Sequence, residues 1–366
     1  MESQVDRTHQ PIDTHRKIVE FVEQGCPFVV ALVLRAEGST PRGAGTKAVI
    51  GSDGKIWGTV GGGAVEAESQ RRALEALELK QPIVFDFHLE GTDRKADVPI
   101  CGGVMRMLVD PTAARNKTAY TQVADAIRQR QRGVLLTTIR AAAPAEVELQ
   151  WFPEGGIPSQ IDFPDAESIS RCLDRETAQL FSNGVTQSAT SVDVLVEPVI
   201  PKPRLLIVGA GHIGQALAVQ AVLVGFDVTV VDDRAEFTDP ALFPEAVTTL
   251  CGDIPKEVAD FPIAEDTYVV VVTRGHKHDA GALRACINKP AAYIGMIGSK
   301  RKVALMKKDF IETGIATEEQ FGRVFAPIGL DIGALTVPEI ATSIVAQLVD
   351  VRRKGRDHAL REGRIR

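Results

Sequence analysis

Arg204-Leu-Leu-Ile-Val-Gly209-Ala-Gly211-His-Ile-Gly214 is the stretch of sequence that decides the fold. The apolar residues 205–208 predict a buried strand, and the G-x-G-x-x-G pattern after them predicts a tight turn into a helix. Residues 226–232 then predict a second buried strand, which ends in an acid. This order of strand, turn, helix, strand and acid is typical of a Rossmann-type unit that binds a dinucleotide.

Each glycine of the pattern has a physical reason. Gly209 allows the tight turn, Gly211 lets the backbone approach a pyrophosphate, and Gly214 lets the helix lie close to the strand. The backbone N–H groups of His212 and Ile213, at the start of the helix, are expected to face the phosphates. A glycine-rich turn that binds nothing remains the alternative, because a fold does not require a site.

An acid stands where the ribose of a dinucleotide is expected. Asp232 follows Gly211 by 21 positions, close to the spacing of about 20 that places a carboxylate on a ribose hydroxyl. This spacing favours NAD over NADP. Asp233 and Arg234 follow at once, and Arg234 leaves contact with a 2′-phosphate or with an FAD group open as alternatives.

Composition restricts the class of protein. With 366 residues, 44% hydrophobic and 25% charged, the chain is typical of a soluble globular protein of two domains. The formal net charge of −6, with both signs interspersed, argues against nucleic acid as the main partner. The N-terminus has no apolar signal region and no window approaches the ~18 apolar residues of a membrane span, so we expect a cytoplasmic protein with no membrane partner. The five cysteines include no C-x-x-C pair, and neither a disulfide framework nor a structural zinc site is predicted.

Prolines mark the expected domain boundary, because proline lacks the backbone donor of a strand or helix interior. We expect a mixed α/β N-terminal domain over residues 1–198, a proline-rich linker over 199–203, a Rossmann-type doubly wound parallel sheet over 204–352 and a basic tail over 353–366. Within the first domain, residues 141–165 are the least regular part, and Trp151, Gly155-Gly156 and Pro158 predict short strands and turns there. Residues 167–181 predict a helix.

Two glycine-rich loops precede this boundary. The first, residues 37–47, carries Ser39, Thr40 and Arg42, and the second, Gly61-Gly62-Gly63, opens a predicted helix that contains Glu66. Three glycines before a helix form a concave row of N–H groups that suits an anion. A flexible connector that only permits close packing is the alternative.

Cys101 stands in a turn beside Gly102 and Gly103. Free cysteines are usually inert core residues. A thiol beside two glycines is approachable from outside, so both a packed and a functional Cys101 stay open.

The predicted strand 266–273 opens into Thr273-Arg274-Gly-His276, at the carboxyl end of the sheet, where ligands of doubly wound folds bind. We expect these side chains to contact a ligand. Metal binding by His276, His278 and Asp279 is one alternative, and helix capping is another.

A further predicted helix begins at Ser299, which is followed by Lys300 and Arg301. Cations at the positive end of a helix are disfavoured unless an anion is near. They indicate phosphate recognition, with a solvated face as the alternative.

These motifs together resemble the XdhC/CoxI family of accessory factors for xanthine dehydrogenase and related molybdenum hydroxylases. The resemblance covers nearly the whole chain and rests on seven motifs in the family's order. They are Gly38-Ser-Thr-Pro-Arg-Gly, Gly58-Thr-Val-Gly-Gly-Gly with Glu66, Cys101-Gly-Gly, the Gly209 pattern, Thr273-Arg-Gly-His-Lys-His-Asp, Tyr293-Ile-Gly-Met-Ile-Gly-Ser-Lys-Arg-Lys and Ala326-Pro-Ile-Gly-Leu-Asp-Ile-Gly-Ala.

The resemblance implies a protein that holds the molybdenum cofactor (molybdopterin), a pterin dithiolene carrying phosphate, and helps to insert it into an apo molybdenum hydroxylase. Cofactor-biosynthesis proteins are the other partners implied, and a homodimer is expected. Two positions depart from the family pattern: Phe325 stands where histidine is common, and Gln347 stands where glutamate is common. From the residues alone, an NAD(P)-dependent oxidoreductase that uses His276 or His278 as proton donor stays open as the second hypothesis.

Overall fold

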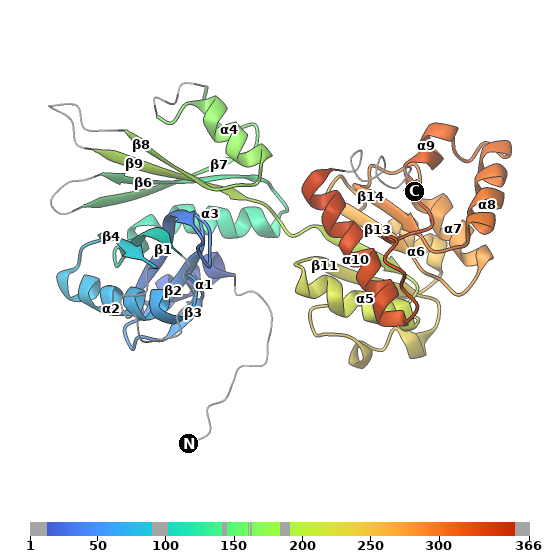
Figure 1. Ribbon diagram of the computed structural model, residues 1–366, viewed down its shortest axis with the longest axis horizontal. Helices are drawn as coiled ribbons and strands as arrows, with labels where there is room; N and C mark the ends of the chain where they lie inside the picture. The colour runs from blue at the N-terminus through green and yellow to red at the C-terminus, as the bar shows by residue number, and fades with distance from the viewer. Residues whose placement is uncertain are drawn as a thin grey trace, which may run out of the picture. The chain divides into compact units, whose positions relative to one another are not determined.

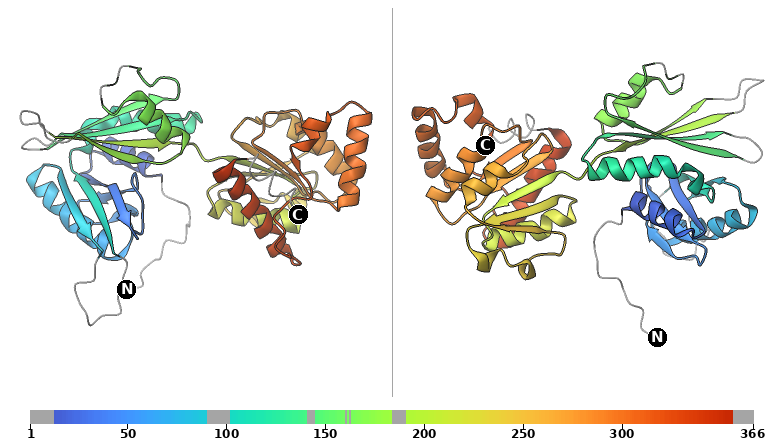
Figure 2. Two further views of the ribbon diagram at one scale, coloured as in Figure 1. Left: turned by 45° about the horizontal axis from the view of Figure 1, so that its top comes forward. Right: turned by 180° about the vertical axis from the view of Figure 1, so that it is seen from behind.

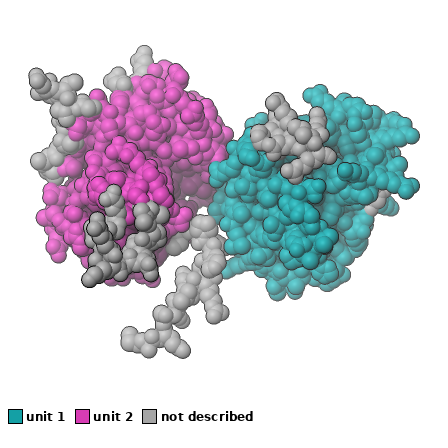
Figure 3. All heavy atoms as spheres, viewed as in Figure 1, with its two compact units in different colours: residues 1–10, 202–366 teal, residues 11–201 magenta. Residues whose placement is uncertain are grey.

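The computed structural model describes residues 13–89, 102–140, 145–159, 161, 163–183 and 191–355, except for the side chain of His276. Within them, the chain forms two compact units, which Figure 3 distinguishes by colour. The N-terminal unit extends to Pro201, and the C-terminal unit begins at Lys202.

The N-terminal unit contains two antiparallel sheets, with strand orders β3-β2-β1-β5-β4 and β7-β6-β9-β8 (Figure 1). Its elements are α1 (Thr14–Gln24), β1 (Phe28–Gly38), β2 (Lys47–Gly51), β3 (Ile56–Gly58), α2 (Gly63–Leu79), β4 (Ile83–His88), β5 (Gly103–Asp110), the 3₁₀ helix η1 (Ala113–Asn116), α3 (Lys117–Arg128), β6 (Gly133–Arg140), β7 (Glu146–Pro153), α4 (Ala166–Asp174), β8 (Gln179–Asn183) and β9 (Val192–Val199).

Strand β1 is buried on both faces because its alternate residues join different cores. Val29 and Val33 pack with α2, whereas Leu32 and Leu34 pack against the second sheet through Leu195. Helices α1 and α3 share a third core with both sheets, and α4 covers the far face of the four-stranded sheet. The unit is thus layered as helix, sheet, sheet, helix, with α1 and α3 beside the inner layer.

One prediction for this unit was wrong. The helix expected over residues 167–181 ends at Asp174, and residues 179–183 form β8, in which Leu180 and Phe181 pair with Leu195 and Val194. Cross-strand pairing, which local helical periodicity does not contain, decides this segment. In the region 141–165, where short strands and turns were expected, the structure forms the strand β7, which pairs with β6 along all eight residues.

The C-terminal unit is built on a six-stranded parallel sheet with the order β12-β11-β10-β13-β14-β15. Its elements are β10 (Arg204–Val208), α5 (His212–Leu223), β11 (Asp227–Asp232), η2 (Ala235–Phe237), η3 (Pro240–Leu242), β12 (Thr248–Cys251), α6 (Ile254–Asp260), β13 (Thr267–Val271), α7 (His276–Cys286), β14 (Tyr293–Met296), α8 (Lys300–Glu312), α9 (Glu318–Gly322), β15 (Val324–Phe325) and α10 (Val337–Lys354).

This strand order is that of a Rossmann fold and confirms the predicted α/β class with a mixed unit before it. Helices α5 and α10 lie side by side on one face of the sheet, and α6, α7 and α8 cover the other (Figures 1 and 2). After β10 the chain continues to β11 on one side of the sheet's centre, and after β13 it continues to β14 on the other side. The loops that follow β10 and β13 therefore border the crevice where such folds bind ligands. Among the described helices, none combines the length and the apolar character that crossing a membrane requires.

Candidate functional site

The glycine pattern after β10 separates crowded positions from an open one. A Cβ on Gly209, where φ is +115°, would lie 2.5 Å from the carbonyl oxygen of Val272, and a Cβ on Gly214 would lie 2.0 Å from that of Gly209. A Cβ on Gly211 would meet no atom within 4 Å. Packing therefore requires glycine at two positions, and the third borders free space, as a phosphate cradle needs.

Helix α5 begins beside this space with Gly211 as its N-cap and without a side-chain cap. The Gln215 side chain instead donates from Nε2 to the Ala210 carbonyl oxygen at 3.0 Å. The N–H groups of His212 and Ile213 start the helix at its positive end. The residues present here fit a pyrophosphate.

Asp232, at the end of β11, is only 2% exposed and is fully engaged within the protein. Its Oδ1 accepts from the backbone N of Arg234 at 3.1 Å and from Nε of Arg234 at 2.8 Å. Its Oδ2 accepts from the backbone N of Ala210 at 2.8 Å and from Nη2 of Arg234 at 3.0 Å. Burial acts to raise the pKa of this carboxyl group, but the hydrogen bonds from Arg234 and Ala210 outweigh it and lower the pKa to about 2.

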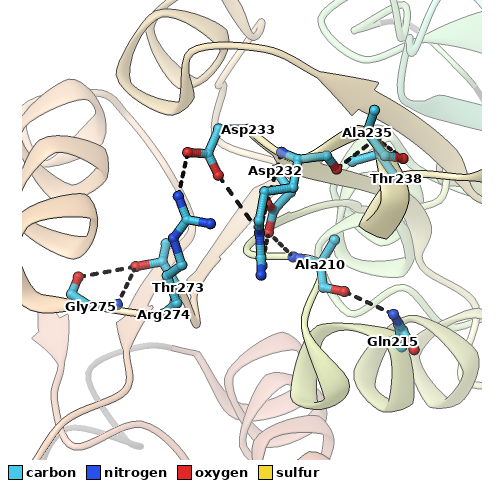
Figure 4. Close-up of polar contacts among 10 residues, drawn as sticks. Ala210, Gln215, Asp232, Asp233, Ala235, Thr238, Thr273, Arg274 and Gly275 are labelled. Carbon is cyan, nitrogen blue, oxygen red and sulfur yellow. Dashed lines mark hydrogen bonds and ion pairs between the residues drawn. The ribbon is translucent and has the colours of Figure 1, made fainter.

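Asp233 lies beside this cluster in a more open position, between two arginines (Figure 4). Its Oδ2 accepts from Nη2 of Arg274 at 2.8 Å, so the loop after β13 is tied to the end of β11. The Arg234 guanidinium lies 3.7 Å from the centre of the Phe237 ring. The structure thus brings together the predicted residues Asp232, Asp233, Arg234 and Arg274.

Thr273 is held by the buried acid Asp279, which the sequence analysis considered only as a metal ligand or a helix cap. Oδ1 of Asp279 accepts from the Thr273 hydroxyl at 2.5 Å and from its backbone N at 3.2 Å. The other oxygen of Asp279, which is 0% exposed, pairs with the Lys302 ammonium. Asp279 stands in the first turn of α7, and its position in the sequence 273–279 was the available signal.

Helix α8 begins with three cations, of which Lys302 is compensated by Asp279. Ser299 caps the helix by accepting from the backbone N of Lys302 at 3.3 Å, and Lys300 and Arg301 are exposed. Among the described side chains, no group of three His, Cys, Asp or Glu residues is placed to hold a metal ion.

In the N-terminal unit, the loop after β1 lies against the turn before β5. Gly38 pairs with Gly103 across these strands. A Cβ on Gly38 would lie 2.5 Å from the Gly102 carbonyl oxygen, and a Cβ on Gly103 would lie 2.6 Å from the Ser39 carbonyl oxygen and 3.0 Å from Cγ2 of Thr40. This contact brings Ser39 and Thr40 next to Gly103. Cys101, which precedes Gly102 in the chain, lies outside the described residues.

The first glycine of the triplet, Gly61, also lies against this loop. A Cβ on Gly61 would lie 2.7 Å from Cγ of Pro41 and 3.9 Å from Cγ of Arg42. Three segments that are far apart in the sequence, 38–42, 61 and 102–103, therefore meet at one end of the five-stranded sheet.

Glu66 occupies part of the predicted anion cradle. Its Oε1 accepts from the Thr59 hydroxyl at 2.5 Å and from the backbone N of Gly62 at 3.1 Å, and the Thr59 oxygen accepts from the backbone N of Gly61 at 3.2 Å. The glycines at 61, 62 and 63 all have positive φ. Two of the N–H groups that the sequence assigned to an anion are thus used within the loop.

A buried ion pair fixes the far end of the loop after β1. Nζ of Lys47 lies 2.7 Å from Oε1 of Glu197, and the two side chains are 6% and 7% exposed. Nζ also contacts Nε2 of His15 at 3.2 Å, and the Thr137 hydroxyl donates to Glu197 at 3.2 Å. Burial and the neighbouring Lys47 charge lower the pKa of His15 well below its usual value. The pair joins the two sheets, because Lys47 begins β2 and Glu197 lies in β9.

Phe325 and Gln347, the two residues that depart from the family pattern, both contact Tyr293. The Phe325 ring stacks on the Tyr293 ring at 4.7 Å between centres, and the Tyr293 hydroxyl donates to Oε1 of Gln347 at 2.6 Å. The same oxygen accepts from the backbone N of Gly329 at 2.9 Å. Burial raises the pKa of Tyr293 well above its usual value, so its hydroxyl acts as a hydrogen donor here.

Comparison with known proteins follows the division into two units. The description "XdhC and CoxI family" matches residues 21–88, and the description "XdhC Rossmann domain" matches residues 205–348. A crystal structure described as a xanthine dehydrogenase from Bacillus halodurans has the same fold, with a TM-score of 0.70 and 22% identity over 92% of this chain and 96% of that chain.

Three curated relatives are similar over most of the chain. The uncharacterized protein YqeB of Escherichia coli (strain K12) is 28% identical over 90% of the chain, which spans 44% of the length of YqeB. A probable xanthine dehydrogenase subunit of Bacillus subtilis (strain 168) is 24% identical over 93% of the chain and 98% of the relative. The molybdenum cofactor insertion chaperone PaoD of Escherichia coli (strain K12) is 25% identical over 93% of the chain and 89% of the relative. With two family descriptions that together match more than half of its residues, the chain belongs to the XdhC and CoxI family.

Proposed function

We propose that this chain is a cytoplasmic accessory factor that holds the molybdenum cofactor and assists its insertion into a xanthine dehydrogenase-type molybdenum hydroxylase. The observation that carries the proposal is the meeting of segments 38–42, 61 and 102–103 at one end of a sheet. Cys101 directly precedes the segment 102–103 in the sequence. The name of the relative PaoD, a molybdenum cofactor insertion chaperone, supports it.

The chemistry of these residues suits such a cargo. The cofactor carries phosphate, for which the Arg42 guanidinium and the hydroxyls of Ser39 and Thr40 are fitting partners. Its metal and dithiolene are soft, and a thiolate such as that of Cys101 is the side chain that a soft centre prefers. Client hydroxylase, cofactor-biosynthesis proteins and a second copy of the chain are the partners that we propose.

Retention of the cofactor tests the proposal. Purified protein mixed with molybdenum cofactor is expected to co-elute with it in size-exclusion chromatography, and Cys101→Ser is expected to reduce the retained cofactor about tenfold or more. Cys251→Ser is the matched control, because Cys251 is an exposed cysteine of the other unit. Failure of the wild-type protein to retain any cofactor would refute the proposal.

We propose further that the C-terminal unit binds a dinucleotide of the NAD(P) class through Gly211 and the start of α5. Gly211→Ala is expected to weaken binding of the dinucleotide about tenfold in calorimetric titration, because its Cβ enters the open space beside the helix start. Gly43→Ala is the control, since a Cβ there also meets no atom within 4 Å but lies in the other unit. Turnover of NAD(P) with an aldehyde or a purine would favour an oxidoreductase instead.

A further inference from the structure

The two consecutive acids at the end of β11 differ in their remaining capacity to accept hydrogen bonds. A carboxylate offers about four lone-pair positions. Asp232 uses them in its four bonds from Arg234 and Ala210, and it is 2% exposed. A ribose hydroxyl that approached Asp232 would have to displace a bond from the charged Arg234 or from the phosphate loop.

Asp233 has the capacity that Asp232 lacks. Its side chain is 30% exposed, and its Oδ2 accepts one hydrogen bond, from Arg274 at 2.8 Å. Its Oδ1 lies 3.9 Å from Nε of Arg234, which is too long for a hydrogen bond. Oδ1 therefore retains room for a hydroxyl donor, and Arg274 fixes the orientation of the carboxylate from the neighbouring loop (Figure 4).

We infer that Asp233, positioned by Arg274, accepts the hydrogen bonds of the adenosine ribose, and that Asp232 holds the phosphate loop through the backbone N of Ala210. The inference rests on the proposed dinucleotide binding. It also sets the preferred ligand: a carboxylate that accepts from a 2′-hydroxyl repels a 2′-phosphate. Arg234 and Arg274 do not offset this, since each is already paired with an aspartate. The cofactor is thus NAD rather than NADP.

The test pairs a change in the protein with a change in the ligand. Affinities for NAD and for its 2′-deoxyadenosine analogue are measured by calorimetric titration of the full chain. A hydrogen bond to a charged group makes the wild-type protein prefer NAD by about tenfold. Asp233→Asn is expected to reduce this ratio to about twofold, and Arg274→Gln is expected to reduce it partly.

Two further variants separate the roles of the acids. Asp232→Asn is expected to weaken both ligands to the same extent and to leave their ratio unchanged, because it loosens the phosphate loop. Glu245→Gln, a change of an exposed carboxylate elsewhere in the unit, is expected to change neither affinity.

The outcomes distinguish a failure of the Asp233 assignment from a failure of the proposed dinucleotide binding. If the wild-type protein binds neither ligand, dinucleotide binding itself is wrong. If it binds NAD but does not discriminate against the analogue, or if Asp233→Asn keeps the tenfold ratio, the assignment of Asp233 is overturned. A ratio that collapses in Asp232→Asn alone would return the ribose contact to Asp232.

Discussion

The loop 59–66 before α2 and the loop 273–279 before α7 belong to different units, yet they share one hydrogen-bond arrangement. In each, a threonine hydroxyl donates at 2.5 Å to an acid in the first turn of the following helix. The same hydroxyl oxygen accepts from a glycine N–H, at 3.2 Å in the first loop and 3.5 Å in the second. Both loops are thus held by a threonine, a glycine and an acid at corresponding positions.

The two loops differ in what neutralises the acid. Asp279 is 0% exposed and pairs with Lys302, whereas Glu66 is partly exposed and forms no ion pair with any described cation. The charge of Asp279 therefore belongs to the interior of the C-terminal unit, and that of Glu66 faces solvent or a ligand. We expect loss of the first acid to affect mainly stability, and loss of the second to affect mainly the site.

Asp279→Asn is expected to have the largest effect, a loss of about 3 kcal/mol in the free energy of unfolding, because it leaves the Lys302 charge without its buried partner. Urea unfolding followed by far-UV circular dichroism measures it. Both tryptophans, Trp57 and Trp151, lie in the N-terminal unit, so tryptophan fluorescence should report an unchanged transition.

Asp309→Asn is the control for this change, because Asp309 is an exposed acid of α8, and it should alter stability by no more than about 0.5 kcal/mol. A loss below about 1 kcal/mol in Asp279→Asn would show that the ion pair between Asp279 and Lys302 contributes little to the stability of the C-terminal unit.

A second prediction concerns pH, because Asp232 is another buried acid of the C-terminal unit. Its pKa is lowered from 3.8 to about 2, so its contribution to stability is present above about pH 4 and is lost as pH falls through about 2. The contribution is about 2 kcal/mol. The difference in unfolding free energy between wild type and Asp232→Asn should shrink as pH falls from 5 to 2, and a difference independent of pH would contradict the prediction.

Replacing the two threonines by valine compares the arrangements directly. Thr273→Val should cost about 1.5 kcal/mol, because it removes one partner of the fully buried Asp279. Thr59→Val should cost about 0.5 kcal/mol, because water can replace the hydroxyl at the more exposed Glu66. Circular dichroism measures the loss in Thr273→Val, and tryptophan fluorescence measures the loss in Thr59→Val. Equal losses of unfolding free energy would mean that the burial of the acid does not explain the difference between the two loops.

Glu66→Gln should have the smallest effect on stability, about 0.5 kcal/mol or less by tryptophan fluorescence, because glutamine keeps an oxygen that accepts from Thr59 and Gly62. Retention of molybdenum cofactor should nevertheless change in this variant. If Glu66→Gln left cofactor retention unchanged and caused a large loss of stability, Glu66 would have a structural role, contrary to our assignment.

What the sequence predicted depends on how local the relevant contacts are. The Rossmann strand, turn, helix and strand follow one another along the chain, and the crowding at Gly209 and Gly214 follows from that local geometry. The engagement of Asp232 by Arg234 and Ala210 could not be predicted, since it depends on side-chain orientation and not on spacing.

In the N-terminal unit the decisive contacts are distant in sequence. The loop at Ser39 reaches Gly103 only because β1 pairs with β5, and Lys47 meets Glu197 only because two sheets pack together. Neither contact leaves a local pattern. The loops were therefore recognised one by one from their glycines, while their meeting point was not.

Tyr293 links the two positions at which the chain departs from the family pattern. Its ring contacts Phe325 and its hydroxyl contacts Gln347, so the two unusual positions share one neighbour. A histidine at position 325 or a glutamate at 347, introduced alone, would place a polar or charged group among partners arranged for a neutral pair. The double change Phe325→His and Gln347→Glu is therefore expected to be tolerated better than either single change.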